Sequence, residues 1–391
     1  MSISLNRRSL LTGAAASGLA APAVAAADFG PVGRPSWAAD GPQGAAARKG
    51  LAFGAAVPSN LLNRSPDFRT ILARDCGLLL GNNEMKMAVV LPEPGRTDFA
   101  PADSVVRFAR AHGQHLRGHA LVWHEALPAW VAPRLAGADA RQAEDLLRRW
   151  IDTVAGRYRG MIESWDVVNE ILAGYGPVRR PDGLRETPWL AALGPGYVDL
   201  AFHLAREADP RAALAWNEDS LEHDFDWVEA RRSRALKRLE GMRARGVPIR
   251  RFGIQAHLVG DHPFDATKFR RFLRELGQLG LGIEITELDI DDKAFPADIA
   301  ARDRAVADVV RRILDVALDE PALLNVVTWG LFDGDTWLND HPDHRRRDGL
   351  RQRPLPLDEG MRPKPFRDAL IAAFRAAPDH SAARARLRNT T

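Results

Sequence analysis

The sequence predicts an α/β protein built as a single (β/α)8 TIM barrel. From residue 50 onward, short apolar runs alternate with longer amphipathic segments. Eight such runs fit within about 330 residues, which suits one barrel domain. The runs are apolar almost throughout, as expected for parallel strands buried on both faces. Together these observations favour a closed parallel barrel surrounded by helices.

The predicted elements follow this alternation in order. The strands are expected at residues 51–57, 76–81, 116–123, 164–168, 212–216, 252–257, 282–288 and 325–330. The helices are expected at residues 103–112, 141–158, 197–208, 225–245, 268–279, 299–318 and 365–376. Gly246 and Gly280 stand just past two of these helices, where glycine commonly ends a helix. A doubly wound open sheet is the competing fold, but no Gly-rich phosphate loop follows the first strand, and we expect no cofactor.

Residues 1–27 are predicted to be an export signal and not part of the fold. Arg7 and Arg8 precede an Ala-rich stretch, and small residues at Ala25 and Ala27 suit a signal peptidase that cuts near Ala27. Adjacent arginines favour the twin-arginine route, which implies a periplasmic or secreted protein. A disordered basic N-terminus is the alternative.

The rest of the chain divides into three parts. An extended lead-in covers residues 28–49, the barrel domain covers 50–377, and a polar, basic tail that we expect to fray covers 378–391. The single cysteine, Cys76, lies in an apolar run and is expected to be a buried packing residue. We expect a monomer.

Composition and charge argue against nucleic-acid or membrane binding. The chain is 46% hydrophobic and 27% charged, as in soluble globular proteins, and no apolar run of the body reaches the ~20 residues that a bilayer requires. The net charge of +3 falls to about +1 once Arg7 and Arg8 are removed, and no basic stripe carries interleaved aromatic residues. The basic cluster at residues 345–347 is interpreted as a solvated loop face, or as a contact to an acidic substrate decoration.

Two predicted strands lead into carboxylates. The strand at 164–168 is followed by Asn169 and Glu170, and the strand at 282–288 carries Glu287 near its end. In a barrel of this kind, functional groups collect at the carboxyl ends of the strands. Cleavage of a glycosidic bond needs one carboxyl group to protonate the leaving oxygen and another to attack or stabilise the sugar cation. A single glutamate would be read as an ion-pair partner, whereas two favour catalysis.

His257 is expected to support this pair. Glu287 and Asp289 are two residues apart and therefore share one face of their strand. His257 ends the neighbouring strand, so it is placed to be held by Asp289 and to orient Glu287. A core histidine bound to the backbone is the alternative.

Aromatic residues gather where predicted strands end. Trp123, Trp329 and Trp337 suit stacking on sugar faces, and His119 suits a hydrogen bond to a sugar hydroxyl; buried structural tryptophans are the alternative. His119 and His124 are five residues apart on a predicted strand and so face opposite sides, which argues against a metal site. We expect no metal.

In these motifs the chain resembles glycoside hydrolase family 10, the endo-1,4-β-xylanases. The resemblance runs over residues 50–376, and its motifs lie at residues 83–86, 119–124, 165–170, 255–257, 285–289 and 329–337. It implies a retaining mechanism on xylan, with Glu170 as acid/base, Glu287 as nucleophile and Asn169 bound to the sugar 2-hydroxyl. It further implies that sugars are held by Asn83, Lys86, His119 and Trp123, walled by Trp329 and Trp337, with Gln255 and His257 beside the nucleophile.

Three positions depart from the family pattern. Asn82 stands where a carboxylate is usual, Ala126 where a glutamine is frequent, and Asp219 follows the fifth strand in a segment that lacks the usual tyrosine. These changes leave open a related β-1,4-glycanase, or an exo-acting enzyme that prefers short xylo-oligosaccharides. A non-catalytic sugar-binding barrel is the alternative from another class, and the presence of both glutamates argues against it.

Overall fold

The computed structural model describes residues 28–174 and 178–389, and the predicted barrel is confirmed. The predicted export signal, residues 1–27, lies outside the described residues. Eight parallel strands form the barrel: β1 (Ala52–Val57), β2 (Leu78–Gly81), β3 (His115–Gly118), β4 (Ser164–Asn169), β5 (Ala213–Glu218), β6 (Arg251–Ile254), β8 (Gly282–Asp291) and β9 (Leu323–Thr328). Neighbours in sequence pair in parallel, and the pairings of β6 with β8 and of β9 with β1 close the barrel. A short further strand, β7 (His257–Val259), pairs with the far end of β8.

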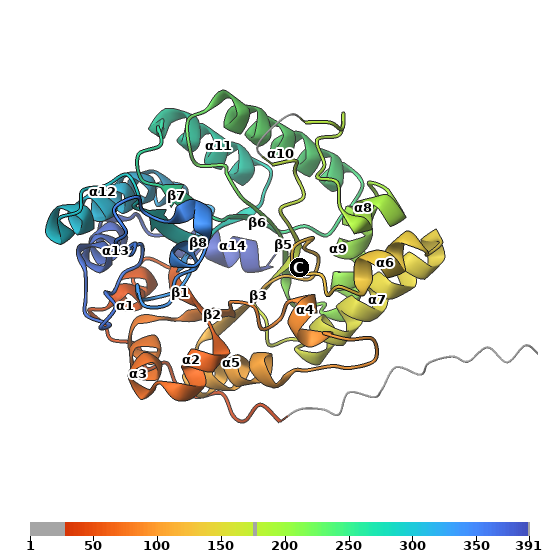
Figure 1. Ribbon diagram of the computed structural model, residues 1–391, viewed down its shortest axis with the longest axis horizontal. Helices are drawn as coiled ribbons and strands as arrows, with labels where there is room; N and C mark the ends of the chain where they lie inside the picture. Colours follow the sequence, from red (N-terminus) through yellow and green to blue (C-terminus); the bar gives the residue numbers. More distant parts are fainter. Residues whose placement is uncertain (1–27, 175–177, 390–391) are drawn as a thin grey trace, which may run out of the picture.

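The described chain contains fourteen α-helices, most of which surround the strands as a ring (Figure 1). They are α1 (Pro42–Ala47), α2 (Ser59–Arg64), α3 (Pro66–Asp75), α4 (Met87–Val90), α5 (Ala100–Ala111), α6 (Val131–Ala136), α7 (Ala140–Arg157), α8 (Pro188–Leu193), α9 (Tyr197–Ala208), α10 (Asp226–Ala244), α11 (Ala266–Gln278), α12 (Ile299–Ala317), α13 (Pro365–Ala376) and α14 (Ser381–Asn389). Two 3-10 turns, η1 (Trp337–Asn339) and η2 (Pro342–His344), follow β9. In residues 28–174 and 178–389, no helix is both long and apolar enough to cross a membrane.

The apolar pattern explains how strands and helices pack. Every residue of β1, β4 and β9 is buried, because one face lines the barrel and the other meets the helices. Helix α7 shows the complementary pattern, with Leu147, Trp150 and Val154 buried on one side at helical spacing. Its start is fixed by a capping box between Asp139 and Gln142.

The barrel interior contains a cluster of buried, charged side chains. Arg117 of β3 forms a bidentate ion pair with Asp166 of β4, and its Nε lies 3.2 Å from Oε2 of Glu284 in β8. Arg251 of β6 donates to the other oxygen of Glu284 at 2.7 Å. Arg117, Asp166 and Glu284 are fully buried. Buried charges persist only when paired in this way, so the four side chains hold four strands to one another across the barrel.

The third strand ends earlier than predicted. β3 stops at Gly118, and the segment from His119 to His124 is a loop. Leu121 and Val122 are buried and donate their N–H groups to carbonyls of β4, which accounts for the apolar run without a longer strand. The argument that His119 and His124 face opposite sides of a strand is therefore wrong.

Other expectations also need correction. The lead-in at residues 28–49 is not extended throughout, because residues 42–47 form α1, in which Ala45 and Ala46 are buried. The predicted strand at 252–257 is divided between β6 and β7, because Ala256 has a positive φ of 61°. The basic cluster at 345–347 is not wholly solvated: Arg346 is buried and bound to Asp292 and Asp348.

The tail does not fray as a whole, because residues 381–389 form α14. Arg384 of this helix donates to the carbonyl of Gly50, just before β1, and His380 is buried against the carbonyl of Leu318. Figure 1 shows α14 in the middle of the ring, and the bond to Gly50 places it at the amino-terminal end of the barrel. Cys76 precedes β2 and is buried as expected, and this burial raises the pKa of its thiol.

Candidate active site

The two predicted carboxylates lie at the carboxyl ends of strands on the same end of the barrel. Glu170 directly follows β4 and has a φ of 53°, a left-handed conformation that is uncommon for a residue with a side chain. Glu287 lies within β8 and is 4% exposed. Strain of this kind is retained where the surrounding structure fixes a side chain in one direction, as at a functional site.

A row of side-chain amides connects the two carboxylates. Asn169 and Gln255 both donate to Oε1 of Glu170, at 3.1 and 2.9 Å. The amide of Asn217, in β5, lies 2.8 Å from Oδ1 of Asn169 and 2.7 Å from Oε1 of Glu287 and donates to both. The carboxyl groups are thus positioned by one continuous set of hydrogen bonds.

Asn217 was not among the predicted site residues. It is fully buried and contacts both halves of the carboxylate pair. The only signal in the sequence is its place, at the end of the fifth strand, where a polar residue follows the buried Trp216. Asparagine is also common where strands lead into turns, so that signal carried little weight.

His257 lies between Glu287 and Asp289. Its Nδ1 is 2.8 Å from Oδ1 of Asp289, and its Nε2 is 3.1 Å from Oε2 of Glu287. Trp337 donates its indole N–H to the other oxygen of Asp289 at 2.7 Å, and its ring meets that of His257 edge to face. Each ring nitrogen of His257 therefore faces a carboxylate, and the imidazole is fixed in place.

The surroundings separate the pKa values of the two glutamates. Burial alone would raise the pKa of Glu287, but the hydrogen bond from His257 and the nearby charges of His119 and Lys86 lower it from 4.5 to about 2. For Glu170, burial and the charge of Asp219 raise the pKa above its ordinary value. Such a split gives one ionised carboxylate and one that keeps its proton to higher pH.

The pKa of His257 moves in the direction that supports Glu287. Burial opposes its charged form, but Asp289 and Glu287 together raise the pKa of the imidazole well above 6.5. A protonated His257 donates from both nitrogens, one to each carboxylate.

One side of the site is formed by Lys86 and two tryptophans. The Lys86 ammonium donates to Oδ1 of Asn83 at 2.9 Å and lies 4.6 Å and 5.4 Å from the ring centroids of Trp123 and Trp329. Lys86 is 5% exposed, whereas both tryptophans are half-buried and keep part of their rings accessible. His119 packs edge-on against Trp329 and is bound by Nδ1 to Asp166 at 2.8 Å. Five of the predicted sugar-binding residues thus lie together on this side of the site: Asn83, Lys86, His119, Trp123 and Trp329.

The three departures from the family pattern occupy different surroundings. Asp219 is paired with the buried guanidinium of Arg231, and Arg185 lies 3.9 Å from it. Ala126 is buried and leaves only a methyl group at its position. Asn82 is half-buried beside the exposed Asn83.

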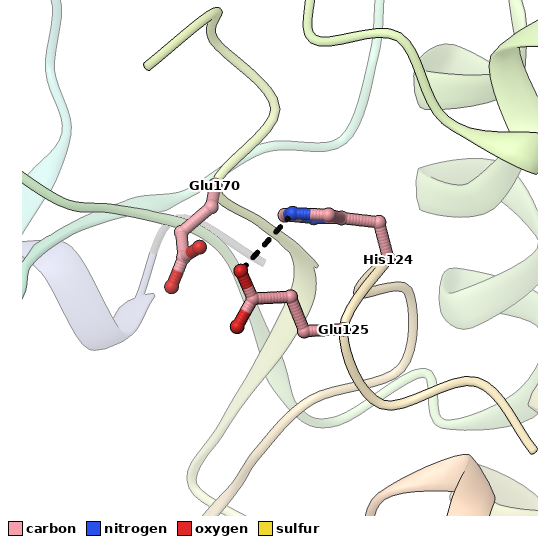
Figure 2. A group of neighbouring side chains, drawn as sticks. All are labelled: His124, Glu125 and Glu170. Atoms are coloured by element: carbon pink, nitrogen blue, oxygen red, sulfur yellow. Dashed lines mark ion pairs between the residues drawn. The ribbon is translucent and has the colours of Figure 1, made fainter. Parts of the chain in front are cut away.

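A second group of polar side chains borders Glu170. Figure 2 shows His124, Glu125 and Glu170, with the carboxylate of Glu125 between the imidazole and the carboxylate of Glu170. His124 Nε2 lies 3.5 Å from Oε1 of Glu125, and one ligand atom from each of the three residues lies within 4.8 Å of the others. Glu125 was not among the predicted site residues.

The fold and this pair of carboxylates define the class of protein. A parallel (β/α)8 barrel that carries two carboxyl groups at strand ends, with pKa values shifted in opposite directions, is typical of glycoside hydrolases. The chain belongs to glycosyl hydrolase family 10, whose model matches residues 43–373.

Relatives and solved structures agree with this assignment. The chain is 32% identical over 302 residues to endo-1,4-beta-xylanase B of Thermotoga neapolitana, covering 76% of this chain and 80% of the relative. It superposes on native xylanase 10B of Thermotoga maritima with a TM-score of 0.76 and 29% identity, covering 85% and 98% of the two chains. Xylanase 10B of Thermotoga petrophila, solved in complex with xylobiose, gives a TM-score of 0.76 at 28% identity, covering 85% and 97%.

Proposed function

We propose that the chain is a retaining endo-1,4-β-xylanase that cleaves internal bonds of xylan by double displacement. The observation that carries the proposal is the amide row from Glu170 through Asn169 and Asn217 to Glu287, because it fixes beside each other two carboxyl groups whose pKa values are shifted in opposite directions. A sugar-binding protein has no need for such a pair, whereas double displacement requires it.

In the first step Glu287 attacks the anomeric carbon while Glu170 gives its proton to the leaving oxygen. The glycosidic bond breaks, and a covalent glycosyl-enzyme forms on Glu287. The hydrogen bonds from Asn217 and His257 keep Glu287 ionised and aimed before attack.

In the second step Glu170 takes a proton from water, which attacks the anomeric carbon and releases Glu287. The charge of Glu287 raises the pKa of Glu170 in the free enzyme, and the ester lacks that charge. Glu170 therefore loses its proton more easily at the stage where it must act as a base.

The tryptophans and Lys86 account for sugar binding. In the proposed complex, Asn83, Lys86, His119 and Trp123 hold the xylose units on the non-reducing side of the cleaved bond, and Trp329 and Trp337 wall the site. Lys86 is held by Asn83 and lies over two indole rings, so it presents a fixed donor to a sugar hydroxyl. Asn169 has its amide beside Glu170, where the 2-hydroxyl of the central sugar is proposed to lie.

A preference for short xylo-oligosaccharides is the second candidate, and the pairing of Asp219 favours it. Because Asp219 is engaged with Arg231, it does not replace the missing tyrosine as a sugar contact. Ala126 removes a further polar contact.

The decisive experiment is product analysis by chain length on glucuronoxylan, arabinoxylan and carboxymethyl-cellulose. An endo-xylanase releases a ladder of oligosaccharides from both xylans, and the first-formed sugar has the β configuration. Release of xylose or xylobiose alone supports the preference for short xylo-oligosaccharides. No activity on any xylan-derived substrate would refute both candidate functions. In Glu287→Ala, turnover is expected to be lost while xylo-oligosaccharide binding survives; unchanged turnover would refute the assignment of the nucleophile.

We also propose that the protein is exported by the twin-arginine route and acts as a periplasmic or secreted monomer. The paired Arg7 and Arg8 before the Ala-rich stretch support the route. Replacing both with lysine is expected to leave precursor in the cytoplasm, which fractionation measures. Light scattering of the purified protein tests the monomer.

A further inference from the structure

We propose that His124, Glu125 and Glu170 form a binding site for a divalent transition-metal ion such as Zn²⁺, and that an ion bound there inhibits the enzyme. The inhibition rests on the proposed role of Glu170 as proton donor. The binding does not, because it follows from the three side chains alone.

The geometry brings three donor atoms from two loops to one place. His124 and Glu125 lie in the loop after β3, and Glu170 follows β4. The three ligand atoms lie within 4.8 Å of one another, and Nε2 of His124 is 3.5 Å from Oε1 of Glu125. Ligands bound to zinc at ~2.0–2.2 Å in a tetrahedral site lie roughly 3.3–3.6 Å apart, so one pair already has the required spacing. Glu125 is exposed, and its side chain can make the remaining approach (Figure 2).

Glu170 has an oxygen available for a metal. Both amide hydrogen bonds, from Asn169 and Gln255, fall on Oε1. The indole N–H of Trp123 also approaches this carboxylate and favours its charged form. Within residues 28–174 and 178–389 no hydrogen bond is formed to Oε2, so this oxygen can take a further ligand, and a metal there would leave the amide row intact. The same carboxyl group cannot hold the catalytic proton while a cation occupies it.

The donor types select the metal. One imidazole nitrogen with two carboxylate oxygens is a set that zinc accepts, with a fourth position left for water. Magnesium and calcium prefer sites made of oxygen alone, and magnesium keeps most of its water. The site should therefore discriminate Zn²⁺ from Mg²⁺.

Nearby positive charges are already engaged. Arg185 donates to the backbone carbonyl of Glu170 at 2.9 Å and lies 3.9 Å from the carboxylate of Asp219. Lys86 is bound to Asn83 and lies against Trp123. In the described chain, neither Arg185 nor Lys86 bridges the carboxylates of Glu125 and Glu170, so the space between them is open to a metal ion.

Calorimetric titration of the purified mature protein with ZnCl2 tests the binding, with MgCl2 as the hard-cation control. Wild type is expected to bind one Zn²⁺. Glu125→Gln and His124→Asn are expected to bind it at least about 10- to 100-fold more weakly, because the loss of a direct ligand should cost no less than the loss of an outer-shell partner. Glu240→Gln, an exposed carboxylate on α10, is the matched control and should bind as wild type does.

Inhibition is measured as the rate with Zn²⁺ divided by the rate of the same variant in EDTA. Wild type should be inhibited and recover on chelation, and Glu125→Gln should need a correspondingly higher Zn²⁺ concentration. Equal Zn²⁺ affinity in wild type and Glu125→Gln overturns the proposal, as does Mg²⁺ binding of equal strength. If the protein failed to hydrolyse xylan, the calorimetry would still decide the site, so the two proposals fail separately.

Discussion

Replacing His257 is expected to move the acid limb of the pH–activity profile to higher pH. In His257→Asn, Glu287 loses the donor at Oε2 and the positive charge 3.1 Å away. Its pKa, lowered from 4.5 to about 2 with His257 present, then rises. Asn217 still donates to Oε1, so we expect a rise of at least about 1 unit, or about 1.4 kcal/mol. Protonated Glu287 cannot attack, and activity is therefore lost as pH falls through this pKa.

The assay is kcat/KM between pH 3 and 8 on an aryl xylobioside, whose good leaving group makes the nucleophile decisive. Wild type should lose little activity at pH 3, because the pKa of its Glu287 is about 2. In His257→Asn this pKa is expected at about 3 or above, so about half of the activity or more should be lost at pH 3. His203→Asn, an exposed histidine on α9, is the control and should follow wild type. An acid limb that stays in place in His257→Asn would refute the argument that His257 keeps Glu287 ionised.

Three further variants test other parts of the structure. Glu170→Ala is expected to lower xylan hydrolysis by about 10²- to 10⁴-fold and to affect activated aryl glycosides less, with turnover on them rescued by azide; an equal loss on both substrates would contradict its role as proton donor. Asn217→Ala breaks the amide row, so steady-state kinetics should show a fall in kcat of about 10- to 100-fold with a smaller change in KM; an unchanged kcat would show that the row does not position the carboxyls. Arg117→Met leaves Asp166 and Glu284 short of a buried partner and should lower the free energy of unfolding by about 3–5 kcal/mol in urea titration; a loss below about 1 kcal/mol would mean that His119 suffices for Asp166 and Arg251 for Glu284.

The parts of the fold that depend on apolar periodicity were predictable. The amphipathic segment expected at 141–158 is α7, Ala140–Arg157, within one residue at each end. The strand before Glu170 was also placed well, since the segment expected at 164–168 is β4, Ser164–Asn169. The strand that carries Glu287 begins at Gly282 as predicted but continues to Asp291, three residues past the predicted end. One-dimensional patterns report burial, and burial is what these elements share.

The prediction errors lie where residues are buried or held by contacts with distant segments and not by a regular strand or helix of their own. Leu121 and Val122 are buried by lateral contact with β4, so the apolar run outlasts β3. In the tail, Arg384 anchors α14 through backbone carbonyls of distant segments, which no local pattern reveals. Asn217 was missed for a related reason. Its role depends on hydrogen bonds to Asn169 and Glu287, which lie on other strands and are not apparent from the local sequence.

The pairing of the first strand with the last has a consequence for synthesis. Thr328 donates to the carbonyl of Gly54, 274 residues earlier in the chain. At roughly 5–20 residues per second, the ribosome needs on the order of 15–50 s to supply this partner of β1. During that time one edge of β1 stays open, and the barrel closes only when β9 has emerged. A chain terminated before β9 lacks the strand that seals its first edge and exposes it to other chains.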